Sequence, residues 1–248
     1  MTFGMILDRS FNLYVRNFGL LFGIMALSQV VNQVNYIVFN EALAGTAGIP
    51  AVLYTPLYLL VNFLTMAVGG GAVTIAVSSR YLDREITILQ SYRIAFSKIW
   101  TLLGAKFVAG LLVGLGLFLL FVPGVLLAVA FTLITPVIML EDCSVANSRE
   151  RSRELTKGFR WQILALFLLY YAGYYLAASV IGGLFAAVTG ALFGIFPFQP
   201  YINQLLVAPL LILPSPIPAL FTVLIYYNQR IKKEGFDLAL LAEALARE

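Results

Sequence analysis

The chain has 248 residues, of which 61% are hydrophobic and 11% charged, and its formal net charge is +4. Because a soluble domain carries about 25% charged residues, this composition excludes an apolar core within a charged shell. The lack of histidine excludes a histidine-ligated metal and a histidine general base, and the single cysteine, Cys143, excludes an internal disulfide.

The placement of the charges indicates a polytopic membrane protein. All sixteen Lys and Arg residues lie within residues 1–18, 80–106, 141–160 and 229–248. Basic residues near span ends are retained in the cytoplasm, so both termini are expected on that side. The cations are interleaved with acids and lie beside spans, so membrane lipids are the expected partner and nucleic acid is not.

The first two spans are expected at about residues 19–39 and 52–79. The first is interpreted as a retained span and not as a cleavable signal, because Asp8 lies in the charged region before it and several amides follow within the same segment. The loop between these spans carries Glu41 but no Lys or Arg. This loop is therefore placed outside.

The third and fourth spans, at about 102–121 and 125–140, are separated by Val122-Pro123-Gly124, which is a turn signal within an apolar run. A tight, uncharged hairpin is expected there.

The fifth apolar run, from Trp161 to about residue 196, would measure roughly 54 Å as one helix, against a hydrocarbon core of about 30 Å. It is expected to end or bend between Gly190 and Pro197. Residues 196–213 would then form an outer interfacial segment, and the last span would occupy about 214–227.

Three short amphipathic stretches of mixed charge, each ahead of a pair of spans, can be laid over one another. They begin at Ser10, Ser91 and Ser152, and each ends in a basic residue followed by an aromatic residue. A helix in the headgroup layer needs these features, although any cytoplasmic loop can acquire a similar composition. The basic and aromatic pairs are Arg16 and Phe18, Lys98 and Trp100, and Arg160 and Trp161.

The expected fold is therefore all-α: a polytopic integral membrane protein with about six transmembrane helices, arranged as three units of an elbow helix plus a hairpin. The whole chain, 1–248, is one membrane domain, with units at approximately 1–79, 80–140 and 141–248.

Two segments resemble a bacterial family. One is an acidic pair, Glu141-Asp142, followed by Arg151-Ser152-x-x-Leu155-Thr156-Lys157-Gly158, and the other is the tail from Tyr226 to Leu238. They resemble the multi-span membrane domain found fused to some glycerophosphodiester phosphodiesterases and in stand-alone uncharacterised membrane proteins. The tail departs from the family at Asn228, where an acid is expected.

The resemblance implies this fold and the bacterial cytoplasmic (inner) membrane, but it implies no activity. A phosphodiesterase would need an additional soluble domain with carboxylates and histidines around a metal, and this chain has no histidine. We find no nucleophile beside a base. The protein is therefore expected to be no enzyme, with no cofactor and no metal site.

The first span is unusually polar for a membrane helix. Its amides must face protein or water, because unpaired amides in lipid are costly. They could line a polar pathway together with tyrosines of the fifth span, or they could form hydrogen bonds that fix helix packing. The residues for this pathway or packing seam are Gln29, Asn32, Gln33, Asn35, Tyr171 and Tyr174.

The segment Leu213-Pro214-Ser215-Pro216-Ile217-Pro218 cannot be regular helix. It could be a broken transporter helix whose carbonyls bind a cation, or it could cap the last span at its outer end. Counting back about 20 residues from Arg230 reaches Leu211, which favours the outer end.

The third elbow and the tail are the candidate contacts for lipid headgroups or a partner, although Glu150 and Glu154 lie close enough to neutralise part of this charge. The candidates are Arg149, Arg151, Arg153, Lys157, Arg160, Arg230, Lys232 and Lys233.

The favoured function is that of a non-enzymatic scaffold or partner subunit with a basic cytoplasmic face on lipid headgroups, whose second expected partner is another membrane or cytoplasmic protein. The alternative is a carrier or permease for an uncharged or lipid-like solute that uses the polar face of the first span. A proton- or ion-coupled carrier usually needs ionisable groups within its spans, and no carboxylate lies within the predicted spans.

Overall fold

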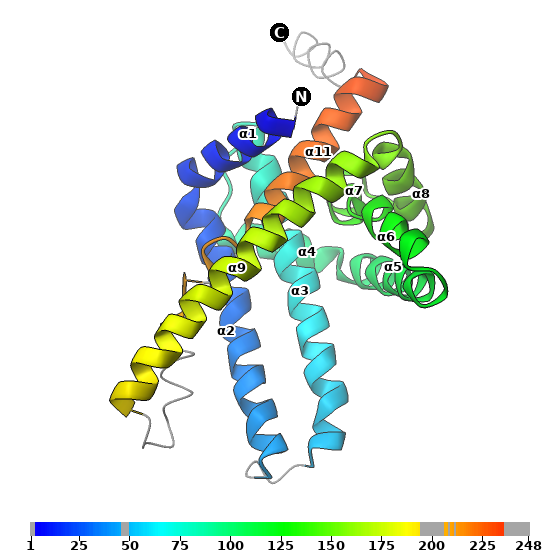
Figure 1. Cartoon of the computed structure of the whole chain (residues 1–248). Helices are drawn as coiled ribbons and strands as arrows, with labels where there is room; N and C mark the ends of the chain where they lie inside the picture. Colours follow the sequence, from blue (N-terminus) through cyan, green and yellow to red (C-terminus); the bar gives the residue numbers. More distant parts are fainter. Residues whose placement is uncertain (1–2, 46–49, 194–205, 208, 211, 236–248) are drawn as a thin grey trace.

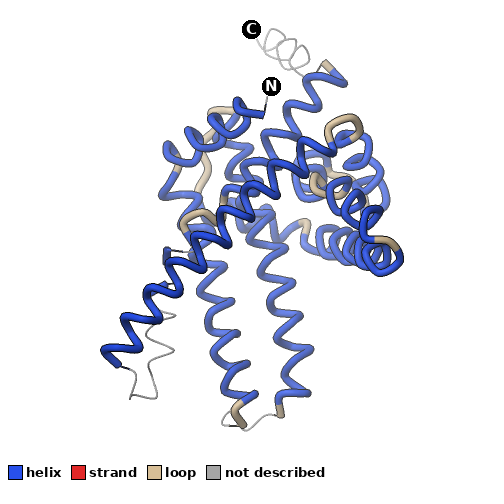
Figure 2. Tube along the Cα trace, viewed as in Figure 1, coloured by secondary structure: helices blue, strands red, loops and turns tan. Residues whose placement is uncertain are grey.

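The computed structural model describes residues 3–45, 50–193, 206–207, 209–210 and 212–235, and this part of the chain is all-α. Its helices are shown in Figures 1 and 2. They are α1 (Phe3–Arg16), α2 (Phe18–Leu43), α3 (Ala51–Tyr81), α4 (Ile88–Ser97), α5 (Ile99–Leu119), α6 (Phe121–Ala130), α7 (Ile134–Glu141), α8 (Val145–Thr156), α9 (Arg160–Phe193) and α11 (Ile217–Glu234).

The protein is a polytopic membrane protein. Five described segments are long and apolar enough to cross a bilayer: α2, α3, α5, the segment of α6 and α7, and α9. The sixth predicted span corresponds to α11, which is not among them because Arg230, Lys232, Lys233 and Glu234 lie in its last turns. This helix begins three residues later than the predicted span and continues seven residues beyond its end.

Each predicted elbow is a helix. α1, α4 and α8 precede the long helices α2, α5 and α9, respectively. A capping box starts α4, in which Thr87 accepts from the backbone N–H of Gln90 and the Gln90 side chain accepts from the Thr87 N–H. The predicted boundary aromatics Phe18, Trp100 and Trp161 are 42%, 83% and 69% exposed, as the predicted elbow units require.

The third and fourth spans differ from the prediction in two places. The chain reverses at Leu120, whose backbone is extended, and Pro123 lies in the first turn of α6, where the missing N–H is no loss. The fourth span is also divided, because residues 131–133 separate α6 from α7. Gly124 permits the hairpin: a Cβ there would lie 2.3 Å from the backbone nitrogen of Leu117.

α9 is one continuous helix from Arg160 to Phe193, and the second half of the interval in which an end or bend was predicted, Gly190 to Pro197, lies outside the described residues. Figure 1 shows this helix crossing the other helices obliquely, and tilt is how a bilayer accommodates an overlong helix. Of the predicted outer segment, 196–213, only residues 206–207, 209–210 and 212–213 are described.

α3 and α11 form the centre of the fold. α3 packs against α2, α4, α5 and α7, and α11 packs against α1, α3, α7 and α8. The α2–α3 hairpin projects away from the end where α1 and the last turns of α11 lie (Figure 1). Ile24, Val73 and Tyr226 are fully buried where these helices meet.

Candidate functional site

The polar face of the first span lies largely in the α2–α3 interface. The Asn35 amide donates to the carbonyl of Tyr58 over 3.1 Å and accepts from the Tyr54 hydroxyl over 2.9 Å. Ser28 shares a 2.7 Å hydrogen bond with Tyr92 of α4. Both Ser28 and Asn35 are buried, so this part of the face is a packing seam.

The other amides of this face form less complete contacts. Asn32 donates to Gln29 over 3.4 Å, but its own Oδ1 is buried without a partner in the described part of the chain. Gln33 is half-buried and has a partner of its own.

The tyrosines of the fifth span do not complete a pathway with these amides. Tyr171 and Tyr174 lie on α9, and their rings contact other aromatic rings of the same helix, those of Phe167, Tyr170 and Tyr175. Within the described residues, no hydrogen bond or ring contact joins them to α2.

The proline segment is bonded to protein. Tyr14 donates to the carbonyl of Leu213, and Tyr170 donates to that of Pro214 over 2.8 Å. Near the other end of α11, Tyr227 hydrogen-bonds to Ser78, close to the end of α3. Helix α11 starts ten residues before Tyr227, about 15 Å along its axis.

The prolines lie at the start of the last helix, as expected of a segment that caps it: Pro216 is the N-cap of α11 and Pro218 lies in its first turn. α11 provides thirteen residues before Arg230, fewer than the about 20 on which the predicted outer-end position was based. The irregular segment before α11 lies partway along α3. Tyrosine hydroxyls donate hydrogen bonds to its carbonyls, which a broken transporter helix would instead offer to a cation.

A cluster of charges joins the ends of α7, α8 and α11. Arg151 makes a bidentate contact with Glu141, with Nε to Oε2 at 2.8 Å and Nη2 to Oε1 at 3.3 Å, and also pairs with Glu234. Arg230 pairs with Glu234 at 3.0 Å and with Glu141 at 3.7 Å. Tyr226 donates to Glu141 over 2.9 Å and accepts from Arg230 over 3.0 Å. We call these five residues the charge cluster.

The cluster favours the charged forms of Glu234, Arg151 and Arg230. Burial alone would raise the pKa of the Glu234 carboxyl, but hydrogen bonds from Arg230 and Arg151 outweigh it and lower that pKa. Burial likewise opposes the charge on Arg151, yet its bonds to Glu141 and Glu234 raise the pKa of its guanidinium. Both arginines are therefore permanently charged partners of the two acids.

Two lysines neutralise the ends of neighbouring helices. Lys98 donates to the carbonyls of Ile138 and Met139 at the end of α7 and pairs with Asp142 at 2.5 Å. Lys233 donates to the carbonyls of Glu154, Leu155 and Lys157 at the end of α8. Cations favour helix C-termini for this reason.

These contacts change the interpretation of three candidates. Arg151, Arg230 and Lys233 were predicted to contact headgroups, but the structure directs their polar atoms to protein groups. Neighbours three and four residues away do not reveal these partners, because Glu141 lies 85 residues from Tyr226 and Lys233 lies 78 residues from Leu155.

The remaining basic candidates face outward to different degrees. Arg153, Lys157 and Lys232 are exposed, and no acidic side chain of the described chain pairs with them. Lys232 lies over the Phe159 ring at 4.6 Å. Arg149 bonds the carbonyl of Val145 in its own helix, and Arg160 is half-buried. We call Arg153, Lys157 and Lys232 the outward cations.

The elbow motif has a structural role that sequence reasoning did not find. Ser152 donates to the carbonyl of Ala130 over 2.7 Å and accepts from the N–H of Leu133 over 3.2 Å. Thr156 lies within 3.5 Å of the same carbonyl. These fully buried hydroxyls satisfy backbone groups at the break between α6 and α7. The signal was a pair of hydroxyls at i and i+4 on the elbow.

The two quoted motifs thus meet in one place: Glu141 and Arg151 come from the elbow motif, and Tyr226, Arg230 and Glu234 come from the tail. Comparisons with family models, with curated proteins and with solved structures found no match. Among the described residues, no group of three or more His, Cys, Asp or Glu side chains could hold a metal ion.

Proposed function

We propose that this protein is a non-enzymatic integral membrane protein that acts as a scaffold or partner subunit, with a basic cytoplasmic face on anionic lipid headgroups. The observation that carries the proposal is the division of the basic side chains. Arg151 and Arg230 fasten helices together, whereas the outward cations are exposed and have no acidic partner among the described residues. Juxtamembrane cations contribute about 1 kcal/mol each at an anionic surface.

The location in the bacterial cytoplasmic membrane, with both termini in the cytoplasm, belongs to this proposal. It is supported by the clustering of basic residues near α1, α8 and α11, whose ends lie at the same end of the fold in Figure 1. Membership in the membrane-domain family is proposed on the two motifs, whose residues make the charge cluster. Nucleic acid has no part in the proposal.

The carrier alternative has less support at the first span. Ser28 and Asn35 of its polar face are engaged by Tyr92, Tyr54 and Tyr58. A pathway along that face would have to open the α2–α3 seam.

The lipid contact is tested in nanodiscs of phosphatidylcholine with or without phosphatidylglycerol. The anionic lipid should raise the melting temperature of the wild type, and this gain should shrink in the triple variant Arg153→Gln, Lys157→Gln, Lys232→Gln. Glu150→Gln, on the same face of the chain's third elbow, is the control and should keep the gain. An equal gain in the triple variant and the wild type would contradict the headgroup role.

The scaffold role is tested by purification in mild detergent followed by identification of stoichiometric protein partners by mass spectrometry. A partner should be recovered with the wild type and retained when Gln29, Asn32 and Gln33 are replaced by leucine. Recovery of the chain without any protein partner, combined with solute transport that these leucine substitutions abolish, would support the carrier instead.

A further inference from the structure

A groove of about 430 Å³ lies between α1, α9 and α11. Helix α1 packs on α11. Helix α9 contacts α11 through the rings of Phe167 and Tyr170, which lie against Phe221. The groove is lined mainly by apolar side chains, among them Phe11, Leu169 and Phe221. Its volume falls within the usual range for small-molecule sites.

The polar groups of this groove are gathered on α1. Asp8 is exposed, and its carboxylate makes no ion pair within the described chain. Ser10 is 2% exposed, and its hydroxyl has no hydrogen-bond partner there. A buried hydroxyl without a partner is costly and uncommon.

Comparison with the other two elbows makes Ser10 distinctive. Ser10, Ser91 and Ser152 begin the three repeats, and all three are buried. Ser91 donates to the carbonyl of Thr87, and Ser152 donates to that of Ala130. In the described part of the chain, Ser10 is the repeat serine whose hydroxyl is left over, and it lines the groove.

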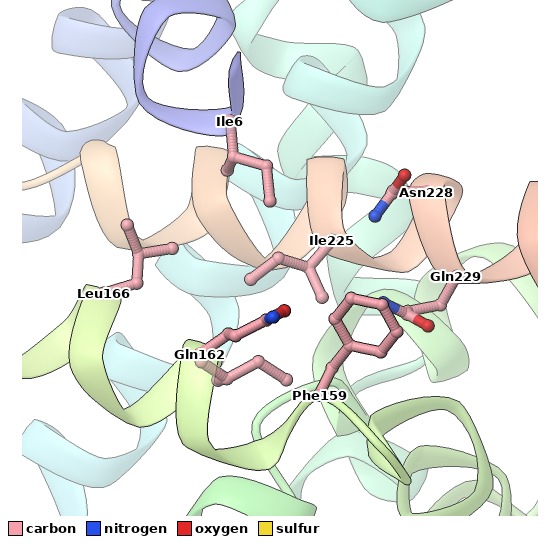
Figure 3. Close-up of a pocket in the computed structure, with 8 residues that line it drawn as sticks. Ile6, Phe159, Gln162, Leu166, Ile225, Asn228 and Gln229 are labelled. Atoms are coloured by element: carbon pink, nitrogen blue, oxygen red, sulfur yellow. The ribbon is translucent and has the colours of Figure 1, made fainter. Parts of the chain in front are cut away.

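A second, small cavity of about 20 Å³ lies between α1, α9 and α11, and Leu166 lines both this cavity and the groove (Figure 3). Gln162 of α9 and Asn228 and Gln229 of α11 line it together with apolar side chains. The Oε1 atom of Gln229 is buried without a partner among the described residues. A space of this size holds one water.

The ligand chemistry follows from these walls. The apolar walls of α9 and α11 match an acyl chain, because α9 is a membrane-spanning helix. The unpaired carboxylate of Asp8 repels phosphate-rich, anionic heads and attracts a cation. The Asp8 carboxylate accepts hydrogen bonds from a primary ammonium, which a quaternary ammonium cannot donate.

We propose that the groove between α1, α9 and α11 binds one membrane lipid whose headgroup carries a primary ammonium, with the ammonium at Asp8 and an acyl chain along α9 and α11, past the buried side of the groove that Ser10 lines. This site is separate from the outward cations, so its test does not depend on the proposed function.

The test uses the full-length protein in phosphatidylcholine nanodiscs doped with one of three lipids that carry the same photoactivatable acyl chain: phosphatidylethanolamine, phosphatidylcholine or phosphatidylglycerol. Adducts are mapped by peptide mass spectrometry. Phosphatidylethanolamine should give the highest yield of adducts on α9 and α11. Asp8→Asn should reduce that yield by about three- to fivefold, the effect of an exposed ion pair.

Leu169→Trp should fill the groove and reduce adducts from all three probes. Leu168→Trp, at an exposed neighbour that does not line the groove, is its control, and Glu150→Gln is the control for Asp8→Asn. Equal labelling by the three probes, with no effect of Asp8→Asn, would overturn the headgroup assignment. Unchanged labelling in Leu169→Trp would overturn the groove itself.

Discussion

Asn32 and Asn35 lie one turn apart on α2, and their amides are in opposite conditions. Both polar atoms of Asn35 are bonded to α3, whereas Oδ1 of Asn32 is buried without a partner in the described chain. The neighbouring helix determines which of these amides is hydrogen-bonded. The sequence could therefore predict a polar face on α2, but not which of its amides would find partners.

Leucine substitutions test this difference. Asn35→Leu should lower the free energy of unfolding by about 1 kcal/mol, since it leaves the Tyr54 hydroxyl without this acceptor and removes the bond to the Tyr58 carbonyl. Asn32→Leu should leave stability unchanged or raise it, because it removes an unsatisfied oxygen. Unfolding in detergent measures both. If Asn32→Leu lowered the free energy of unfolding more than Asn35→Leu, the Asn32 amide would have a bonding partner outside the described contacts.

Gly69 is a contact that sequence reasoning missed. A Cβ at this position would lie 2.4 Å from Oγ of Ser28, whereas one at Gly110 would meet nothing within 4 Å. Gly69→Ala should therefore destabilise the protein by about 1–3 kcal/mol through overpacking. Gly110→Ala, also inside an apolar helix, should not reduce the melting temperature. Equal behaviour of the two variants would contradict the close α2–α3 approach.

At the scale of elements, the break between α6 and α7 depends on α8. Ser152→Ala should lower the free energy of unfolding by about 1–3 kcal/mol, because it leaves the Ala130 carbonyl and the Leu133 N–H without this hydroxyl. Ser97→Ala is the control, since Ser97 is exposed and bonds only the carbonyl of Ile94 in its own helix. If the two variants are equally stable, Ser152 does not support the break.

The junction of α7, α8 and α11 should be sensitive to acid. The pKa of Glu234 is lowered below its ordinary value of 4.5, so its contribution to stability is fully present above that value and is lost as the pH falls through the folded-state pKa. Melting temperatures measured from neutral pH to below 4.5 should fall. In Glu234→Gln, this fall should be smaller than in Glu150→Gln. Parallel curves for the two variants would contradict the role of Glu234.

Hydropathy and charge placement predict the helical elements well, because each span and elbow depends on residues within its own segment. The elbows preceding α2, α5 and α9 and the boundary aromatics are examples. The division of the fourth span and the hydrogen bonds of the proline segment are not predictable in this way. Both depend on hydroxyl groups from distant parts of the chain, Ser152 in one case and Tyr14 in the other.

At the scale of the whole molecule, the expected orientation can be tested through Cys143, the chain's only thiol. An impermeant maleimide applied to sealed right-side-out vesicles should leave it unmodified, and permeabilisation should allow labelling. Burial and the nearby Glu141 raise the pKa of this thiol above 9.0, so the reaction should speed up at alkaline pH. Labelling before permeabilisation would refute the orientation.

The candidate site was only partly predictable at this scale. The sequence identified the basic residues of the third elbow and of the tail, and it identified both motifs separately. Their meeting could not be inferred, because Glu141 and Tyr226 are brought together only by the packing of α11 against α7 and α8. Hence Arg151 and Arg230 were predicted to face lipid, whereas their acidic partners fasten them to protein.

The bond from Tyr14 to the carbonyl of Leu213 spans 199 positions of the chain. Since α1 packs more extensively on α11 than on α2 or α3, the first elbow acquires its main partner only after α11 has been synthesised. Early helices can enter the bilayer before this contact forms. A nascent chain truncated before residue 213 would leave the first elbow at the membrane surface without the bond from Tyr14. This unpaired elbow is a feature by which quality control can recognise incomplete products.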